Sequence, residues 1–324
     1  MKVFVTGATG FIGKRLVDKL IKNGDEVIAL VRNQKHNLPN EVKVIYGDII
    51  EMDSFKYAGA GCSRLYHLAA MITFDPKRRD ELLRINGQGT LNILSAAKYW
   101  DIDRTVIISS ACTMGLSYKK EQILNETNQP NSELIANNPY MESKLLAERY
   151  AIESTKNQTV VVVNPTTVYG PGDWTLNSGT LILKISKSKV IPVPSGGSNV
   201  IDVDDVVEGI IAAGERGKSG SRYILGGENL SFKEIFSEIA DVVDCNPLFV
   251  RLPHFMRIPM SVSVGVLGKI TQNRFLTSQI IGDMFAYKFY SNKLAKEKLG
   301  WVPRYTFKES IERAIEFYRR EGLL

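Results

Sequence analysis

Short apolar runs alternate with amphipathic stretches through the first half of the chain. The runs are rich in β-branched residues and lie at Val3–Val5, Val27–Val31, Val42–Tyr46, Leu65–Leu68, Val106–Ile108 and Val160–Val163. Between them, apolar residues recur at helical spacing, as at Ile12, Leu16 and Leu20 and across residues 80–99. Strands that alternate with helices predict βαβ units and a parallel sheet with both faces buried. We therefore predict an α/β fold built on a doubly wound parallel sheet.

The alternation ends after residue 165, where Gly, Pro and Ser gather around Tyr169–Gly172 and Pro192–Gly197. The apolar stretch Phe249–Phe289 has no clear period. Beyond residue 165 we expect strands at Val200–Val203 and Tyr223–Leu225, and helices at Val206–Ala213, Phe232–Val243, Pro259–Ile270 and Thr306–Arg320. The predicted sheet domain covers residues 1–165 with return segments at about residues 200–226. Residues 166–199 and 227–324 are expected to form a smaller C-terminal region packed on it.

Composition narrows the class of protein without naming a function. The 324 residues include 41 Lys and Arg against 35 Asp and Glu, a net charge of +6. The basic residues are not concentrated, so no nucleic-acid partner is predicted, and the excess fits a small anionic ligand. Three cysteines outside any CxxC pair predict a reducing, cytoplasmic location. No apolar run reaches the roughly 20 residues of a membrane span, so no stable membrane insertion is expected.

A glycine-rich loop follows the first predicted strand and opens the first predicted helix. Residues 6–13 have the sequence TGATGFIG. Gly7 permits a tight turn, Gly10 lets the backbone approach a pyrophosphate, and Gly13 lets helix and strand pack closely. A helix N-terminus also offers free N–H groups to phosphates. The loop predicts dinucleotide binding by Gly7, Thr9, Gly10, Phe11, Ile12 and Gly13.

The end of the second predicted strand bears on which dinucleotide binds. A carboxylate there would hold the ribose 2′-hydroxyl of NAD, but Ala29–Lys35 contains none. Arg32 and Lys35 can instead pair with a 2′-phosphate. The sequence therefore favours NADP(H). NAD(H) stays open as the alternative, in which the two basic residues belong to a solvated loop.

Tyr140 and Lys144 are four residues apart in a predicted helix that begins at Asn138-Pro139. A cation beside the phenol favours tyrosinate, so we expect Lys144 to lower the pKa of Tyr140 and make it an acid/base. The strand at Val106–Ile108 runs into Ser109 and Ser110. Ligands bind at the carboxyl ends of parallel strands, where a serine hydroxyl can hold a substrate oxygen.

Together these motifs resemble the extended branch of the short-chain dehydrogenase/reductase superfamily, the NAD-dependent epimerase/dehydratase family. The resemblance implies a Rossmann domain with a substrate-binding C-terminal region. It assigns the substrate oxygen to Ser110, with Ser109 as the fallback, the proton to Tyr140 and a proton relay to Asn86. It assigns Lys144 to the ribose hydroxyls and to lowering the Tyr140 pKa. Further cofactor contacts implied by the resemblance are Asp48, Ile49, Leu68, Ala69, Ala70, Tyr140, Lys144, Pro165, Thr167 and Val168.

Departures from the family patterns narrow the reaction. Dehydratases carry Asp-Glu after the active-site Ser or Thr, whereas this chain has Ala111 and Cys112. The Arg that nucleotide-sugar epimerases place before the V-x-D segment is missing from Gly197–Val200, and no R-x-G-D occurs. Val31-Arg32 and the apolar loop at Met71–Phe74 instead resemble the dihydroflavonol-4-reductase-like and 3β-hydroxysteroid-dehydrogenase-like branch.

The sequence therefore predicts an NADP(H)-dependent carbonyl reductase or alcohol dehydrogenase for a small apolar substrate. No metal is expected. Expected substrate contacts are Met71, Ser110, Cys112, Tyr169 and Trp174, with Ile72 and Phe74 further candidates for an apolar wall; Cys112 can equally be a buried small hydrophobe. The alternatives are an NAD-dependent nucleotide-sugar epimerase and a non-catalytic NADP(H)-sensing protein. The resemblance also implies a homodimer through the helices at residues 80–99 and 140–157.

Overall fold

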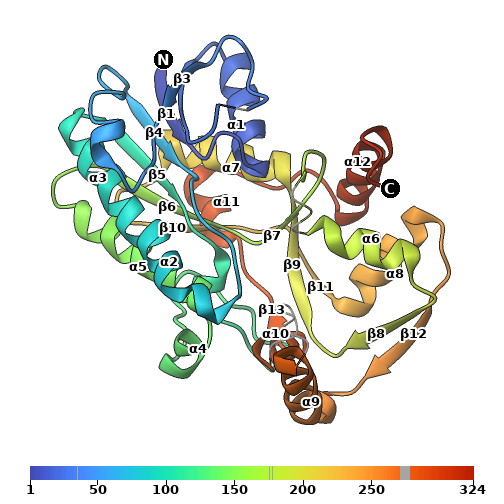
Figure 1. Cartoon of the computed structure of the whole chain (residues 1–324). Coiled ribbons are helices and arrows are strands. Elements are labelled where there is room, and N and C mark those ends of the chain that lie inside the picture. The colour runs from blue at the N-terminus through green and yellow to red at the C-terminus, as the bar shows by residue number, and fades with distance from the viewer. Residues whose placement is uncertain (35, 175, 177, 271–277) are drawn as a thin grey trace.

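The computed structural model describes residues 1–34, 36–174, 176, 178–270 and 278–324. Its central element is a parallel sheet of seven strands, in the order β10-β6-β5-β4-β1-β2-β3 (Figure 1). The strands are β1 (Lys2–Thr6), β2 (Glu26–Val31), β3 (Lys43–Tyr46), β4 (Arg64–His67), β5 (Arg104–Ile108), β6 (Val160–Pro165) and β10 (Arg222–Leu225). The chain reverses its direction of winding between β1 and β4, which is where such sheets bind ligands. The predicted doubly wound sheet is confirmed.

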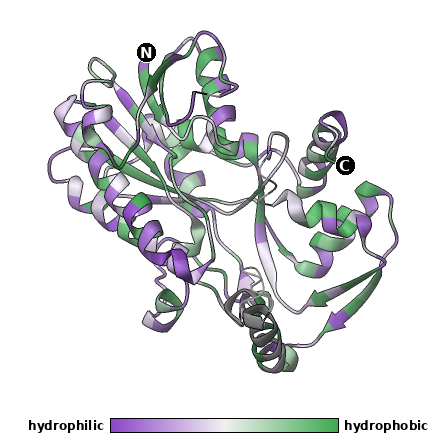
Figure 2. Ribbon diagram, in the orientation of Figure 1, coloured by the Kyte–Doolittle hydropathy of each residue, from purple (hydrophilic) through white to green (hydrophobic). Residues whose placement is uncertain are grey.

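Alternate side chains of each strand serve two separate cores. Val3 and Val5 pack with the helices α1 (Phe11–Lys22), α7 (Val203–Arg216) and α11 (Lys293–Leu299). Phe4, between them, faces the opposite layer with α3 (Gly89–Tyr99). The strands of the central sheet are accordingly coloured largely as hydrophobic in Figure 2. Each strand thus needs apolar residues at nearly every position, which explains the continuous runs in the sequence.

The helix expected over residues 80–99 is interrupted. It comprises α2 (Arg79–Leu82), a π-helical segment at Leu83–Gln88, and α3. One extra residue per turn shifts the face that the segment presents, and such π segments often occur at functional sites. Asn86 lies inside the segment, at the sheet edge where β4 ends.

The C-terminal region forms a second unit beside the sheet. Its sheet contains β7 (Thr167–Tyr169), β9 (Gly197–Asp202), β11 (Glu228–Ser231) and β13 (Tyr287–Lys288), and β8 (Val190–Pro194) pairs with β12 (Leu248–Leu252). Its helices are α6 (Gly179–Lys187), α8 (Phe232–Val243), α9 (Arg257–Ile270), α10 (Ser278–Asp283) and α12 (Phe307–Arg320). The remaining helices are α4 (Ser132–Ala136) and α5 (Pro139–Ser154). The stretch at 249–289, without clear period in the sequence, therefore contains regular elements.

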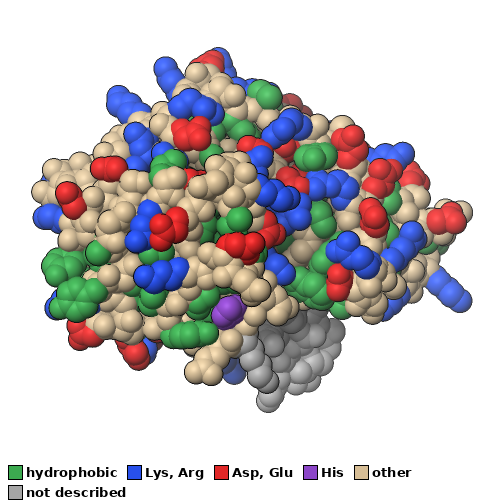
Figure 3. All heavy atoms as spheres, turned by 90° about the horizontal axis from the view of Figure 1, so that it is seen from above, with side chains coloured by type: hydrophobic (Ala, Val, Ile, Leu, Met, Phe, Trp, Pro, Cys, Tyr) green, Lys and Arg blue, Asp and Glu red, His purple; other side chains and the backbone are tan. Residues whose placement is uncertain are grey.

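The domain boundaries interleave more than the sequence predicts. Of the return segment at about residues 200–226, β10 belongs to the central sheet and α7 packs against that sheet. Residues 200–202 lie instead in β9 of the smaller sheet. Helix α11, in the range assigned to the C-terminal region, packs against the central sheet. No helix among the described residues is both long and apolar enough to cross a membrane. On the face shown in Figure 3, basic and acidic side chains are interspersed.

Candidate active site

The glycine loop packs tightly against the segment that follows β4. Gly7 has φ +70°, and a Cβ there would lie 2.6 Å from the backbone nitrogen of Ala69. A Cβ at Gly13 would collide with the carbonyl oxygen of Gly7. Gly10 is the exposed N-cap of α1, and no side chain among the described residues caps that helix. The N–H groups of the first turn are thus free for an anion, so the loop fits a dinucleotide pyrophosphate.

Two basic residues were predicted at the tip of β2. Arg32 is exposed and forms no ion pair with another described residue, so its guanidinium is available to a ligand. Lys35 lies outside the described residues. After β3, Asp48 accepts a hydrogen bond from the backbone N–H of Ile50 at 3.0 Å, and Ile49 is buried. Asp48 therefore shapes this turn with one of its carboxylate oxygens.

The two serines after β5 point in opposite directions. The hydroxyl of Ser109 donates to buried Glu148 Oε1 at 2.5 Å. Ser110 is half-buried, lies near enough to the phenol of Tyr140 to lower its pKa, and accepts from the backbone N–H of Cys112 at 3.3 Å. Successive residues of an extended segment face opposite sides. The structure thus pairs Ser110, and not Ser109, with Tyr140.

Lys144 is buried beneath these residues on α5. Its Nζ donates to the backbone carbonyl of Ile108 at 3.0 Å, which ties the helix to the end of β5. Burial lowers the pKa of Lys144 to about 8, and the Cys112 and Glu148 side chains act in the opposite direction. Burial and Cys112 raise the pKa of Tyr140, while the hydrogen bond from Ser110 lowers it. The net shift of the Tyr140 pKa is upward because burial outweighs the other contributions, and the predicted lowering of this pKa by Lys144 stays a prediction.

Asn86 acts on the backbone around the site. Its Oδ1 accepts from the N–H of Met71 at 2.7 Å, and its Nδ2 donates to the Met71 carbonyl at 3.0 Å and to Ser143 Oγ at 2.9 Å. The amide thereby fastens the loop after β4 to helix α5. The Asn86 backbone carbonyl accepts from the hydroxyl of Thr90 at 2.6 Å, and the proton relay predicted for Asn86 stays a prediction.

His67, at the end of β4, was missed by the sequence reasoning. It is buried, with Nδ1 2.7 Å from Thr6 Oγ1 and Nε2 3.0 Å from Thr90 Oγ1. The Thr90 hydroxyl donates its proton to the backbone carbonyl of Asn86, so it can only accept from His67. His67 therefore donates from Nε2 and accepts from Thr6 at Nδ1. Burial and the charge of Lys144 lower the pKa of His67 to about 3, so the imidazole is neutral. The available signal was a lone His directly before the Leu68-Ala69-Ala70 segment.

Asn164, at the end of β6, was also absent from the predicted site. Its Nδ2 donates to Glu148 Oε1 at 2.6 Å and to the carbonyl of Ser110 at 3.1 Å. The neighbouring residues Pro165, Thr167 and Val168, predicted to flank the nicotinamide, lie at the end of β6 and in β7. Thr167 Oγ1 is 2.8 Å from Ser198 Oγ of β9. The segment from Pro165 to Val168 therefore connects the two sheets beside the turn at Ser109–Thr113 (the serine turn).

The predicted substrate wall is only partly assembled. Cys112 is half-buried and near enough to raise the pKa of Tyr140. Phe74, 45% exposed, lies edge-on to the Tyr140 ring at 5.7 Å. Tyr169, however, is buried against Phe307 of α12.

Trp174 stacks edge-on against Phe317, also of α12, at 5.0 Å. Tyr169 is thus buried in the packing of the C-terminal helix, whereas Trp174 contacts that helix but stays 49% exposed, and both predicted substrate contacts stay predictions. Met71 remains beside the site through its hydrogen bonds with Asn86.

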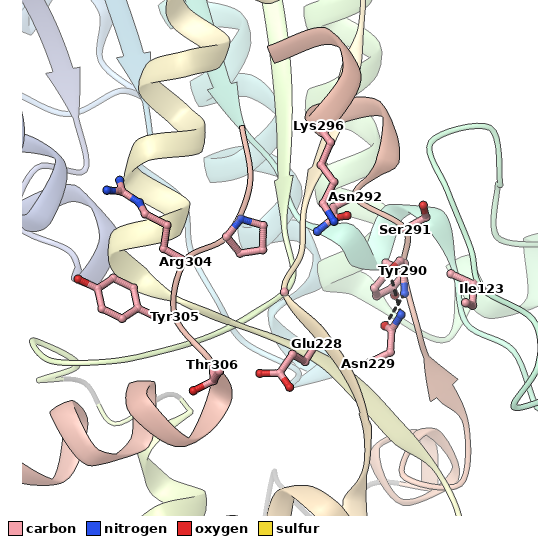
Figure 4. Close-up of a pocket in the computed structure, with 12 residues that line it drawn as sticks. Ile123, Glu228, Asn229, Tyr290, Ser291, Asn292, Lys296, Arg304, Tyr305 and Thr306 are labelled. Atoms are coloured by element: carbon pink, nitrogen blue, oxygen red, sulfur yellow. Dashed lines mark hydrogen bonds between the residues drawn. The ribbon is translucent and has the colours of Figure 1, made fainter. Parts of the chain in front are cut away.

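A cavity of about 430 Å³ lies elsewhere, between β11 and the segment leading into α12 (Figure 4). Asn229 lines it and binds both backbone groups of Tyr290, at 2.9 and 3.1 Å. The hydroxyl of Tyr290 donates to the carbonyl of Gly115, beyond the turn that carries Ser110. Ser110, Tyr140 and Lys144 do not line this cavity. It is therefore separate from the candidate active site.

Comparison with known proteins agrees with this geometry. The model described as NAD dependent epimerase/dehydratase family matches residues 3–226. The chain belongs to that family. The resemblance predicted from the sequence motifs is thereby confirmed, and with it the dinucleotide-binding class of the sheet domain.

The epimerase/dehydratase relatives match along the whole chain. A Synechocystis sp. protein provisionally named dihydroflavonol 4-reductase is 31% identical, over 98% of this chain and 95% of its own length. Sterol demethylase protein B of Methylococcus capsulatus is 26% identical over the full length of both chains. The crystal structure of gox2253 superposes with a TM-score of 0.87 at 28% identity, covering 99% of each chain. The chain thus belongs to an NAD(P)-dependent enzyme family in which named relatives are oxidoreductases.

Proposed function

We propose that this epimerase/dehydratase family member is an NADP(H)-dependent oxidoreductase that interconverts a carbonyl and an alcohol on a small apolar substrate. The observation that carries the proposal is the assembly of Ser110, Tyr140 and Lys144 at the end of β5, in the same sheet whose first strand leads into the glycine loop. All three lie at the carboxyl edge of the central sheet, next to its change of winding.

The residues present fit a dinucleotide. The uncapped start of α1 would hold the pyrophosphate, and Arg32 would pair with a 2′-phosphate. Lys144 would hold the ribose hydroxyls, as the family resemblance implies. When bound, the cofactor supplies or accepts the hydride. Exposed Ile72 and Phe74 would offer an apolar wall to the substrate.

The protein's own part in the reduction is to hold the oxygen and deliver a proton. The Ser110 hydroxyl would donate to the carbonyl oxygen and stabilise the charge that develops there. As a hydride adds to the carbonyl carbon, the C=O π pair moves to oxygen, which takes the proton of Tyr140 Oη. The upward shift of the Tyr140 pKa keeps the phenol protonated before the reaction, so its proton is present when negative charge develops on the substrate oxygen. The nearby Lys144 ammonium would stabilise the tyrosinate that remains.

The Tyr140→Phe substitution tests this role. It removes the proton donor and keeps the ring against Phe74, so we expect turnover to fall by roughly 10²–10⁴-fold. The assay is NADPH oxidation with a panel of aryl ketones and aldehydes. NADPH binding, followed by fluorescence titration, should persist. Undiminished turnover in the variant would contradict the mechanism.

The two alternatives have their own readouts. Neither Ser198 nor Asn199 of β9 can supply the cation with which an epimerase would grip a diphosphate, and both are buried. Strong thermal stabilisation by a UDP- or GDP-sugar would nevertheless favour the epimerase. Firm NADPH binding without turnover of any alcohol or carbonyl in the panel would favour the sensing protein.

A further inference from the structure

Glu148 brings a buried carboxylate to the floor of the candidate site. Its side chain is 5% exposed and lies on α5, one helical turn after Lys144. Oε1 accepts three hydrogen bonds, from Ser109 Oγ at 2.5 Å, Thr113 Oγ1 at 2.8 Å and Asn164 Nδ2 at 2.6 Å. Oε2 pairs with Arg222 of β10 at 3.1 Å.

These bonds determine where the serine turn lies. Ser109 and Thr113 bracket Ser110, and both are fastened to Glu148. Asn164 links the same carboxylate to the carbonyl of Ser110. The turn cannot move away from α5 without breaking this set of bonds. Tyr140 and Lys144 sit on the same helix, so Glu148 fixes the distance between the serine and its partners.

The carboxylate also acts on Lys144 through space. Burial disfavours the ammonium form, whereas Glu148 and the Cys112 thiol favour it. The titratable groups that interact electrostatically with Lys144 are His67 from β4, Cys112 from the serine turn and Glu148 from α5, and Tyr140 lies one helical turn before Lys144 on α5. His67 is neutral, and Arg222 pairs with the Oε2 oxygen of Glu148. Glu148 is thus the carboxylate in this set that supports the ammonium.

We propose that Glu148 is a positioning residue of the reaction, which holds the Ser110 turn against α5 and supports the positive charge of Lys144. This inference rests on the proposed function, since it concerns the same catalytic residues. It assigns Glu148 no contact with substrate or cofactor. Its two effects, on geometry and on charge, can be separated by experiment.

The main test is Glu148→Gln, which keeps the size and an acceptor oxygen and removes the charge. Without the carboxylate the Lys144 ammonium loses its proton at lower pH. We therefore expect the alkaline limb of the kcat profile, measured by NADPH oxidation with the carbonyl panel, to move down by roughly one pH unit. The alkaline limb of NADPH affinity, measured by fluorescence titration, should move in the same direction. The matched control is Glu153→Gln, an exposed carboxylate on the same helix, which should leave both profiles in place.

A purely structural role would lower the thermal unfolding midpoint of Glu148→Gln and leave both pH limbs unchanged, and that result would overturn the inference. If the Gln variant does not fold, Glu148→Asp carries the test. Asp keeps the charge but has a shorter reach, so kcat should fall while the alkaline limb stays in place. A displaced limb with undiminished kcat in the Asp variant would overturn the inference.

Tyr140→Phe in the same assays separates the two proposals. Loss of turnover in Tyr140→Phe, together with a parental pH profile in Glu148→Gln, overturns the role of Glu148 alone. Undiminished turnover in Tyr140→Phe overturns the proposed function.

Discussion

Ser109 and Ser110 are consecutive residues after β5, and their side chains face opposite sides of the chain. Both follow β5, and the sequence leaves both as candidates for the substrate oxygen. The structure turns Ser109 toward buried Glu148 and Ser110 toward Tyr140. The distinction depends on Glu148, which is 39 residues further along the chain. Local sequence could therefore locate the strand end but could not decide which hydroxyl points into the interior.

The prediction that the protein binds NADP(H) in preference to NAD(H) depends on Arg32. Its guanidinium is exposed at the end of β2 and has no ion-pair partner among the described residues. Arg32→Ala should weaken NADPH binding by roughly tenfold to a hundredfold, the effect of losing a charge-assisted hydrogen bond to phosphate, and should change NADH binding little. Fluorescence titration with both cofactors measures this. Tighter binding of NADH than of NADPH by the parent protein would show that NAD(H) is the cofactor.

At the scale of the elements, His67 connects three of them through one directional chain of hydrogen bonds. Thr6 of β1 donates to His67 of β4, which donates to Thr90 of α3, which donates to the carbonyl of Asn86. The backbone N–H of Ala69 also donates to Thr6 Oγ1 at 3.2 Å. The glycine loop and the π-helical segment are thereby held by the same neutral imidazole.

This chain of hydrogen bonds through His67 makes the folding stability of the protein sensitive to acid. The folded-state pKa of His67 is lowered to about 3 from the ordinary 6.5, so the unfolded chain binds a proton first as pH falls. The parent should lose about 1.4 kcal/mol of unfolding free energy per pH unit below pH 6.5 through this group. His67→Gln should be less stable at pH 7 but lack this loss.

Urea denaturation between pH 7 and pH 5 measures the effect, and exposed His254→Gln serves as the control. The difference in stability between the parent and His67→Gln should narrow as pH falls. A constant difference would mean that His67 takes up its proton at the same pH in the folded and unfolded chains, so that its pKa is not lowered by folding.

Elements with a strong period were predictable, and elements that depend on distant contacts were not. The strands of the central sheet follow from their continuous apolar runs, because each strand serves two cores. The spacing of Tyr140 and Lys144 placed both on one helix. The apolar spacing over Leu83–Gln88 also fits an ordinary α-helix, so the sequence does not reveal that this segment is π-helical. Tyr169 is indistinguishable by sequence from an aromatic residue of a binding loop.

For the whole molecule, ion pairs join the C-terminal helix to the sheet domain. Arg313 of α12 pairs with Asp202, at 2.9 Å, and with Asp204. Asp204, at the start of α7, also binds Arg15 of α1 at 2.6 Å. A helix from the end of the chain thus shares a carboxylate with the helix that begins at the glycine loop. Sequence alone could not predict this arrangement, because its members are up to 298 positions apart in the numbering.

Arg313→Met tests how strongly this cluster holds the two units together. The substitution keeps an apolar stem but leaves Asp202, which is fully buried, without the cation that compensates its charge. Removing one partner of a buried ion pair costs about 3–5 kcal/mol, and the partial exposure of Arg313 places the expected loss near the lower figure. Urea denaturation gives the loss directly, with Arg320→Met, an exposed cation on the same helix, as the control. Because Arg15 still holds Asp204, NADPH affinity should change by less than about threefold. A loss of stability no larger than that of Arg320→Met would show that α12 is held by its apolar contacts alone, through Phe307, Ile311 and Ile315.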